Sequence, residues 1–341
     1  MTLIRHTQPN PLKGWQVDPA AIRMIGHDLS RPECILAERD GSLWAADGRG
    51  GVMHIHADGG QKFIALHAPT TTDTNIFGGT QPNGLAFARN GDILIANFGT
   101  DALEIMSRDG KTRTLYDSID GKPLGKVNFV LRDSKDRLWI TISTKINPWN
   151  DAISSRQADG YIALIDEKGL RIVADGFYFT NEIRFDAHEE WLYVAETCAR
   201  RVTRLRVAPD GSLSRREVYG PSSLGSGLID GIAFDAFGNL WATMIFADRL
   251  IAITPDGEAL TLFEDSNREA VARFDTEFDS GVIVSAETIS TTNSKIAPMM
   301  TSVTFGGADL RTVYLGSLLG TSLPSFQSPV AGLPMIHWNE R

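Results

Sequence analysis

The stretch GSLWAAD at residues 41–47 places an apolar pair directly after a turn glycine, and a similar pattern recurs along the chain. The five further copies are GDILIAN at 91–97, DRLWITI at 136–142, EWLYVAE at 190–196, GNLWATM at 238–244 and RTVYLGS at 311–317. Aligned on their third residues, the copies are separated by 50, 45, 54, 48 and 73 residues. A four-stranded propeller blade takes roughly 40 to 50 residues, so the spacing predicts six blades with an insertion in the last interval.

The segments around each copy support an all-β fold. Alternation within the copies is β-like, and Asp-Gly turns at 58–59, 109–110, 210–211 and 256–257 close further hairpins. We therefore predict a six-bladed β-propeller with four-stranded antiparallel blades, in a single domain over 1–341. Residues 1–30 are expected to supply a leader and the outer strand that closes the ring, beside the C-terminal segment 331–338. The rival fold, two stacked β-sandwiches, would not predict one turn motif at blade spacing.

Two segments depart from the blade pattern. DSNREAVARFDTEF at 265–278 has a helical period and begins with an Asp or Ser cap, which accounts for part of the long sixth interval. STKINPWNDAISSRQADG at 143–160, which contains Trp149 and Arg156, is a long non-strand insertion. It either covers the mouth of the channel or is a plain surface loop. Trp44, Trp139 and Trp241 share one position in the repeat and are expected to pack between blades.

Composition and charge exclude several classes of protein. The 341 residues are 42% hydrophobic, and 33 Lys and Arg against 42 Asp and Glu give a net charge of -9. This charge disfavours nucleic-acid and anionic-membrane partners, and no apolar run approaches the roughly 18 residues of a membrane span. The polar start, with no signal-peptide pattern, favours a cytoplasmic protein. Cys34 and Cys198 are too few for a disulfide framework, and no serine-hydrolase, zinc-protease or nucleotide-binding motif is present.

Counting back about ten residues from each copy reaches the expected innermost strand of each blade. Five of the six positions carry a carboxylate or a carboxamide, and the sixth is apolar: Glu33, Asn83, Asn128, Asn181, Asp230 and Val303. Asn83 in Pro-Asn-Gly is equally explained as a turn former, whereas this explanation is weaker for Asp230 in Asp-Gly. Glu33 has no turn preference, and each carboxylate precedes an apolar strand.

Two carboxylates brought together at a channel mouth are costly unless one is protonated or a cation lies between them. Calcium takes six to eight oxygen ligands, including carboxylates and Asn carbonyls, so the pattern predicts a site for one divalent cation. Calcium is the first choice, with zinc, manganese and iron as alternatives. Waters would complete the shell and leave a position for substrate, and Gly231 is expected to leave room beside the ion.

The chain resembles the SMP-30/gluconolactonase/LRE-like family of metal-dependent lactonases. The resemblance is carried by four residues in their local sequences: Glu33 in RPECILA, Asn128 in KVNFVLRD, Asn181 in FTNEIRFD and Asp230 in LIDGIAFDAFGNLW. The resemblance covers residues 30 to about 255 and implies a six-bladed propeller. It implies Glu33, Asn181 and Asp230 as metal ligands and Asn128 as a ligand or substrate contact. Cys34 and Glu182 stand where many members have Gly, and Lys126 stands where sugar-lactone hydrolases of the family often have Arg.

The sequence thus predicts a hydrolase that opens a sugar lactone or related small cyclic ester at a cation on the propeller axis. Asp230 is the expected catalytic residue. It would act as a base or as a nucleophile, and the sequence leaves open that it is only a metal ligand. Lys126, Asn128 and Asn83 are expected to contact the small-molecule substrate. Two alternatives remain open: a phosphotriesterase-like or promiscuous esterase at the same metal, and a non-catalytic propeller that binds a ligand or partner. The sequence does not indicate an oligomeric state.

Overall fold

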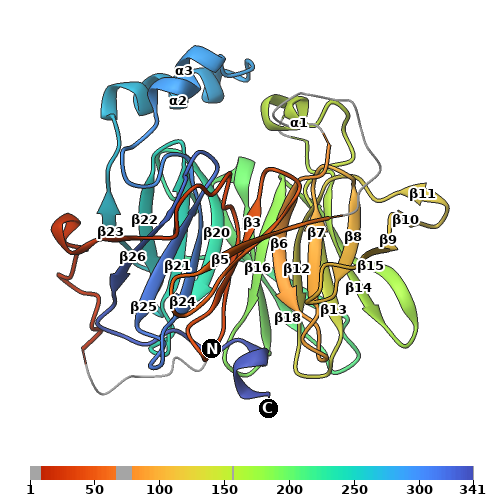
Figure 1. The fold of residues 1–341 in the computed structure, drawn as a ribbon. Coiled ribbons are helices and arrows are strands. Elements are labelled where there is room, and N and C mark those ends of the chain that lie inside the picture. Colours follow the sequence, from red (N-terminus) through yellow and green to blue (C-terminus); the bar gives the residue numbers. More distant parts are fainter. Residues whose placement is uncertain (1–8, 67–78, 156, 341) are drawn as a thin grey trace.

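Six four-stranded antiparallel sheets surround one axis in the computed structural model, which describes residues 9–66, 79–155 and 157–340 (Figure 1). In the first five blades the strands run outward from the axis in chain order, and the innermost strands of neighbouring blades contact one another. The predicted all-β six-bladed propeller is therefore confirmed. No helix in these ranges is long and apolar enough to cross a membrane.

The first three blades are each built from four consecutive strands, the innermost first. The first blade contains β2 (Ile35–Ala37), β3 (Leu43–Asp47), β4 (Gly51–Ile55) and β5 (Gln61–Ala65). The second contains β6 (Pro82–Phe87), β7 (Ile93–Asn97), β8 (Ala102–Met106) and β9 (Thr112–Tyr116). The third contains β12 (Val127–Arg132), β13 (Leu138–Ile142), β14 (Gly160–Asp166) and β15 (Gly169–Phe177). A hairpin of β10 (Ser118–Ile119) and β11 (Lys122–Pro123) connects the second blade to the third.

The remaining blades continue the same order. The fourth contains β16 (Thr180–Phe185), β17 (Trp191–Glu196), β18 (Arg201–Val207) and β19 (Leu213–Tyr219). The fifth contains β20 (Leu228–Phe234), β21 (Leu240–Ile245), β22 (Arg249–Ile253) and β23 (Ala259–Glu264). The sixth contains β24 (Met300–Gly306), β25 (Thr312–Ser317), β26 (Leu323–Gln327) and, as its outermost strand, β1 (Arg23–Ile25).

Ring closure differs in one respect from the prediction. β1 does supply the outer strand of the last blade, but it pairs with β26, where Met24 lies opposite Pro324. The segment 331–338 lies elsewhere: Gly332 bridges Asp235 of the fifth blade, and His337 Nε2 lies 2.9 Å from the carbonyl oxygen of Ala37 in the first. It ends in the short helix η3 (Ile336–Asn339) near the end of the axis opposite the long helices (Figure 1). Residues 1–8 of the expected leader lie outside the described residues.

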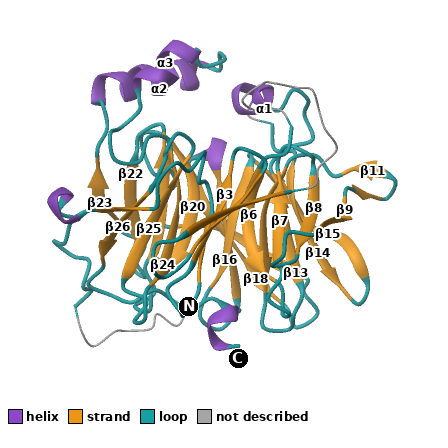
Figure 2. Ribbon diagram, in the orientation of Figure 1, coloured by secondary structure: helices purple, strands orange, loops and turns teal. Residues whose placement is uncertain are grey.

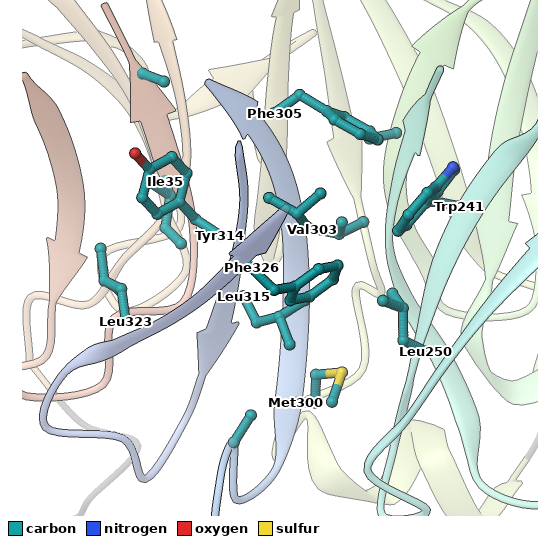
Figure 3. Close-up of a cluster of buried hydrophobic side chains, with 14 of the residues drawn as sticks. Ile35, Trp241, Leu250, Met300, Val303, Phe305, Tyr314, Leu315, Leu323 and Phe326 are labelled. Atoms are coloured by element: carbon teal, nitrogen blue, oxygen red, sulfur yellow. The ribbon is translucent and has the colours of Figure 1, made fainter. Parts of the chain in front are cut away.

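The three tryptophans of the repeat pack between blades, as predicted. Trp139 makes an edge contact with Phe185 of the fourth blade at 5.4 Å, and Trp241 makes one with Phe305 of the sixth at 5.2 Å. The guanidinium of Arg108, from the second blade, lies 4.8 Å from the ring of Trp44. Figure 3 shows Trp241 facing the apolar side chains of the sixth blade.

The α-helices α1, α2 and α3 lie at one end of the propeller (Figure 2). α1 (Asn150–Ser155) lies within the insertion after β13, and α2 (Arg268–Ser280) and α3 (Ala286–Thr291) fill the long sixth interval. The predicted helix begins later than expected, because Asn267, not an Asp or a Ser, caps α2 by accepting a hydrogen bond from Ala270 N at 3.3 Å. α3 leads into β24, an innermost strand, so this is the end where the innermost strands begin.

Short 3-10 segments complete the described structure: η1 (Pro19–Ala21) and η2 (Thr197–Ala199), in addition to η3.

Candidate metal centre

A β-bulge recurs at the predicted axial position. In the second blade Pro82 pairs with Asn97 and Leu85 with Ile95, which leaves an extra residue in β6. The same shift occurs in β12, β16, β20 and β24. A bulge changes the direction in which a side chain points and interrupts the strand pairing. Asn83 and Asp230 therefore lie inside strands, at bulges, and are not turn formers.

The bulges place the predicted residues at the same end of the axis, on adjoining blades. Glu33 lies two residues before β2, and Asn128, Asn181 and Asp230 lie within two residues of the start of their strands. All four are buried. We call Glu33, Asn83, Asn128, Asn181 and Asp230, together with one residue of the sixth blade, the axial ring.

Direct contacts link members of the axial ring. Asn83 Nδ2 donates to the backbone oxygen of Asn128 at 3.0 Å, across the second and third blades. Asn181 Nδ2 donates to Thr197 Oγ1 at 3.1 Å, so the amide nitrogen of Asn181, and not its carbonyl oxygen, bonds to this hydroxyl. Thr301 Oγ1 donates to the backbone oxygen of Glu33 at 3.1 Å, which joins the sixth blade to the first.

The two ring carboxylates are electrostatically coupled. Burial raises the pKa of Asp230 well above its ordinary value, the charge of Glu33 raises it further, and a hydrogen bond from Asn181 opposes the rise. Burial also raises the pKa of Glu33 to about 7, although the Arg31 guanidinium acts in the opposite direction. Without a further positive charge the site therefore resists holding both carboxylates in their ionised form.

The donor set fits a hard cation. Asn128 Oδ1 is buried and has no hydrogen-bond partner among the described residues, and the buried Glu33 Oε2 lies 3.1 Å from Arg31 Nη2. Buried oxygens normally have partners, so an orphaned amide oxygen beside two carboxylates is consistent with a cation that prefers oxygen ligands. Within the described ranges, no three His, Cys, Asp or Glu side chains lie together in a way that could hold a metal ion. A site here must therefore rely on amide oxygens.

The sixth position of the axial ring is Thr301 and not Val303. The bulge of β24 falls between Met300 and Val303, so Thr301 corresponds to Asp230 in the fifth blade. Val303 is fully buried in the apolar cluster that also contains Trp241 and Phe326 (Figure 3). Counting ten residues back gave the wrong residue in this blade, because its hairpin is two residues longer.

The two unusual residues Cys34 and Glu182 lie one position beyond the axial ring. Cys34 Sγ accepts a hydrogen bond from Leu85 N at 3.3 Å. Glu182 Oε2 lies 2.9 Å from Arg184 Nη2 and accepts from Ile232 N at 3.2 Å. The Glu182 charge therefore has its own partners on the side of the ring away from the helices.

Gly231 does not leave room beside an ion, contrary to the expectation from the sequence. A Cβ at this position would lie 2.4 Å from the backbone oxygen of Thr301 and 2.6 Å from Ser302 Cα. The glycine is needed because the fifth and sixth inner strands approach each other closely there. Gly231 is therefore explained by the packing of two strands and not by space for a ligand.

The predicted substrate contacts Lys126 and Asn83 already have protein partners. Lys126 Nζ lies 2.8 Å from Asp101 Oδ1 and donates to the backbone oxygen of Phe98 at 3.2 Å. Asn83 Oδ1 accepts from Arg31 Nη2 at 2.9 Å. Lys126 thus lies at the rim of the axial ring, whereas Asn83 is a member of it and bonds to Asn128.

Arg31 is the residue of this site that sequence reasoning missed. Its Nη2 lies 3.1 Å from Glu33 Oε2, and its Nη1 donates to the backbone oxygen of Pro82 at 3.0 Å. The residue has a left-handed backbone with φ 50°, which is uncommon for a side chain of this size. The sequence offered only its position two residues before Glu33, because no glycine marks the left-handed turn at this residue.

A cavity of about 380 Å³ occupies the other half of the axis. Its lining includes Cys34 and Arg184 at one end and Met335 and His337 of the C-terminal segment at the other. None of the axial ring residues lines it. The cavity is therefore separate from the candidate centre.

Comparison with known proteins agrees with this architecture. The sequence model described as the SMP-30/Gluconolactonase/LRE-like region matches residues 31–267. The 6-deoxy-6-sulfogluconolactonase of Pseudomonas putida is 25% identical over 160 residues, which are 46% of this chain and 45% of that protein. The match thus spans less than half of that relative's length.

Solved structures share the fold at low identity. A gluconolactonase from Xanthomonas campestris superposes with a TM-score of 0.63 and 19% identity, over 89% of this chain and 88% of that one. Regucalcin from Agrobacterium tumefaciens, described as a calcium-binding protein, gives a TM-score of 0.64 and 16% identity, over 90% and 92% of the two chains. At these identities the likeness shows the fold alone.

Proposed function

Because the chain belongs to the SMP-30/Gluconolactonase/LRE-like family, we propose that it is a metal-dependent hydrolase that opens a lactone at a divalent cation, calcium, on the propeller axis. The observation that carries the proposal is the axial ring. It combines two carboxylates that repel each other with buried amide oxygens, and the amide oxygen of Asn128 has no hydrogen-bond partner among the described residues. The names of the gluconolactonase and regucalcin structures agree with this chemistry.

In this proposal Glu33, Asn181 and Asp230 hold the cation, with Asn128 as a further ligand. When bound, the cation would polarise the lactone carbonyl and stabilise negative charge on its oxygen. Asn128 and Asn83 orient the substrate at the ring, and Lys126 contributes from its rim. Water adds to the acyl carbon, the ring C–O bond breaks, and the alkoxide takes up a proton, which gives the hydroxy acid.

Asp230 is the proposed catalytic residue. A carboxylate that binds a cation has a lowered pKa, which weakens it as a base, so Asp230 acts either by orienting a water and accepting its proton or by attacking the carbonyl itself. Its neighbour Asn181 donates a hydrogen bond that favours the ionised form. Both roles require the negative charge, whereas a ligand-only role requires an oxygen atom.

The test compares Asp230→Asn with Glu33→Gln after metal analysis of the purified protein. A panel of lactones is assayed by acid release with increasing calcium. We expect excess calcium to restore the activity of Glu33→Gln at least in part. The activity of Asp230→Asn should stay roughly 100-fold or more below that of the unmodified protein even with excess calcium. Full rescue of Asp230→Asn would limit this residue to a ligand role. Protein that binds no divalent cation would refute the metal-dependent hydrolase.

A further inference from the structure

A second ring of side chains lies two residues before the axial ring. Its members, in order from the first blade to the sixth, are Arg31, Gln81, Lys126, Phe179, Leu228 and Met299. Each of them precedes its innermost strand or stands at its start, so these residues lie towards the helical end, where the innermost strands begin. The first three blades contribute polar residues, and the last three contribute apolar ones.

The apolar half continues into a larger hydrophobic cluster. Phe179, Leu228 and Met299 belong to one buried cluster with Phe274 and Phe278 of α2. Phe274 stacks on Phe246, which follows β21, with ring centroids 4.5 Å apart. In Figure 1, α1, α2 and α3 stand over this end of the propeller. The apolar surface thus extends from the inner strands up to the helices.

Partly exposed apolar side chains form the rim of this cluster. Trp149, Tyr178, Phe246 and Leu318 pack against it without being fully buried. Trp149 makes an edge contact with Phe98 of the second blade at 5.2 Å and lies 6.1 Å from Phe179 of the fourth. Leu319, next to Leu318, is 51% exposed. Exposed apolar side chains grouped beside a polar centre are typical of ligand-binding sites.

The apolar residues at the helical end are poorly suited to bind a polyhydroxylated ligand. A sugar lactone carries hydroxyls around its ring, and each one loses hydrogen bonds to water when it is placed against an apolar wall. The cations on the other half already have partners, because Arg31 contacts Glu33 and Lys126 contacts Asp101. An alkyl or aryl group, in contrast, gains free energy from burial against the partly exposed rim residues.

We propose that the substrate is a lactone or ester with an apolar substituent, which lies over the fourth to sixth blades and against Trp149. The inference rests on the proposed lactone hydrolysis and specifies its substrate class. The reacting carbonyl lies at the axial ring, towards the polar half. The substituent faces the partly exposed rim residues, behind which the buried Phe179 and Met299 lie.

The experiment uses the full chain loaded with calcium and δ-lactones that carry no side chain, a pentyl chain or a heptyl chain, beside glucono-δ-lactone. We expect kcat/KM to rise by roughly two- to fourfold per added methylene. Glucono-δ-lactone is expected to be at least about tenfold poorer than the pentyl lactone. A value of kcat/KM that does not rise with chain length, or that is highest for glucono-δ-lactone, overturns the proposal.

A variant locates the apolar site. Trp149→Ala is expected to reduce the gain per methylene, whereas Trp191→Ala, a control at the start of β17 and therefore at the opposite end of the blades, should leave it unchanged. An unchanged gain in Trp149→Ala would overturn the placement.

A binding measurement tests the apolar site independently of the proposed lactone hydrolysis. Calorimetry with 5-hydroxydecanoate and gluconate measures recognition even if no lactone is hydrolysed. Tighter binding of the alkyl acid without turnover would support the apolar site and refute lactone hydrolysis. Equal, weaker or absent binding of the alkyl acid would overturn the apolar site.

Discussion

Arg31 supplies positive charge to the candidate centre from the protein itself. Its guanidinium reaches Glu33 Oε2, Asn83 Oδ1 and the Pro82 carbonyl, and so connects the first blade to the second. Its side chain is only 14% exposed, so water screens this charge little. The same guanidinium that stabilises Glu33 repels any cation that approaches the same carboxylate. Arg31 therefore has opposite effects on the metal-free and the metal-bound protein.

Replacing Arg31 by Met is expected to separate these two effects. The metal-free variant should lose about 2 to 3 kcal/mol of unfolding free energy, because a buried carboxylate loses its partner. Its affinity for calcium should rise roughly tenfold, because a like charge leaves the site. Urea unfolding without metal and calcium titration calorimetry measure the two effects.

Two controls belong to this prediction. Arg31→Lys keeps the charge and should bind calcium nearly as the unmodified protein does. Lys126→Met removes a cation that is already paired with Asp101, so its effect on calcium affinity should be smaller. Weaker calcium binding by Arg31→Met would show instead that the guanidinium mainly holds Glu33 and Asn83 in their ligating positions.

At the scale of the element, a turn shared by several blades fixes each tryptophan. An acidic side chain six residues before the tryptophan accepts the indole N–H: Glu38 from Trp44, Asp133 from Trp139 and Asp235 from Trp241, at 2.6, 2.9 and 2.9 Å. Asp235 also accepts backbone N–H groups from Phe237 and Asn239 at 3.0 and 2.9 Å. The turn thus orders the first hairpin of the blade and the inter-blade packing together.

Asp235→Ala should therefore be strongly destabilising. The change leaves a fully buried indole N–H and two backbone donors without their acceptor, and we expect a loss of about 3 kcal/mol or more. Asp210→Ala is the matched control, because Asp210 accepts from Ser212 in an exposed turn and should cost about 1 kcal/mol or less. Both are measured by urea unfolding. Equal losses in the two variants would mean that the indole hydrogen bond is unimportant.

The elements also show which parts of the site the sequence could predict. Counting back from the apolar pairs found Glu33, Asn83, Asn128, Asn181 and Asp230, because the first hairpins of five blades have nearly equal lengths. It failed at Val303, where the hairpin is longer and the bulge falls at Thr301. A bulge depends on the pairing between two strands, and no single strand's composition encodes it.

At the scale of the whole molecule, the contacts between segments far apart in the chain were hardest to predict. Arg31 contacts Asn83, and α2 packs with Phe179 and Leu228, although none of these segments has a motif that points to its partner. The C-terminal segment 331–338 was expected beside the strand that closes the ring. Its position depends on partners in other blades, such as the backbone oxygen of Phe234 and the guanidinium of Arg132.

The C-terminal segment connects four blades at the end opposite the helices. Leu333 N donates to the oxygen of Phe234 at 2.8 Å, Gly332 N to that of Leu310 at 2.8 Å, and His337 contacts Ala37. Glu340 Oε1 accepts from Arg132 Nη1 of the third blade at 2.7 Å. A segment held by contacts to the first, third, fifth and sixth blades restrains the ring against opening.

The Glu340 contact makes this restraint dependent on pH. Arg132 holds the pKa of Glu340 below its ordinary value, so the contact stabilises the fold above the unfolded-state pKa and is lost as pH falls through the lower folded-state pKa. Glu340→Gln should cost about 1 kcal/mol of unfolding free energy between pH 6 and 8, and this difference should shrink towards zero below about pH 4.5. Glu258→Gln, which removes an ion pair between two half-exposed side chains, should cost less than about 0.5 kcal/mol. Urea unfolding of the three proteins across this pH range measures the difference. A loss in Glu340→Gln that does not change with pH would show that the segment is held by its packing and its backbone hydrogen bonds, and that the carboxylate charge contributes little.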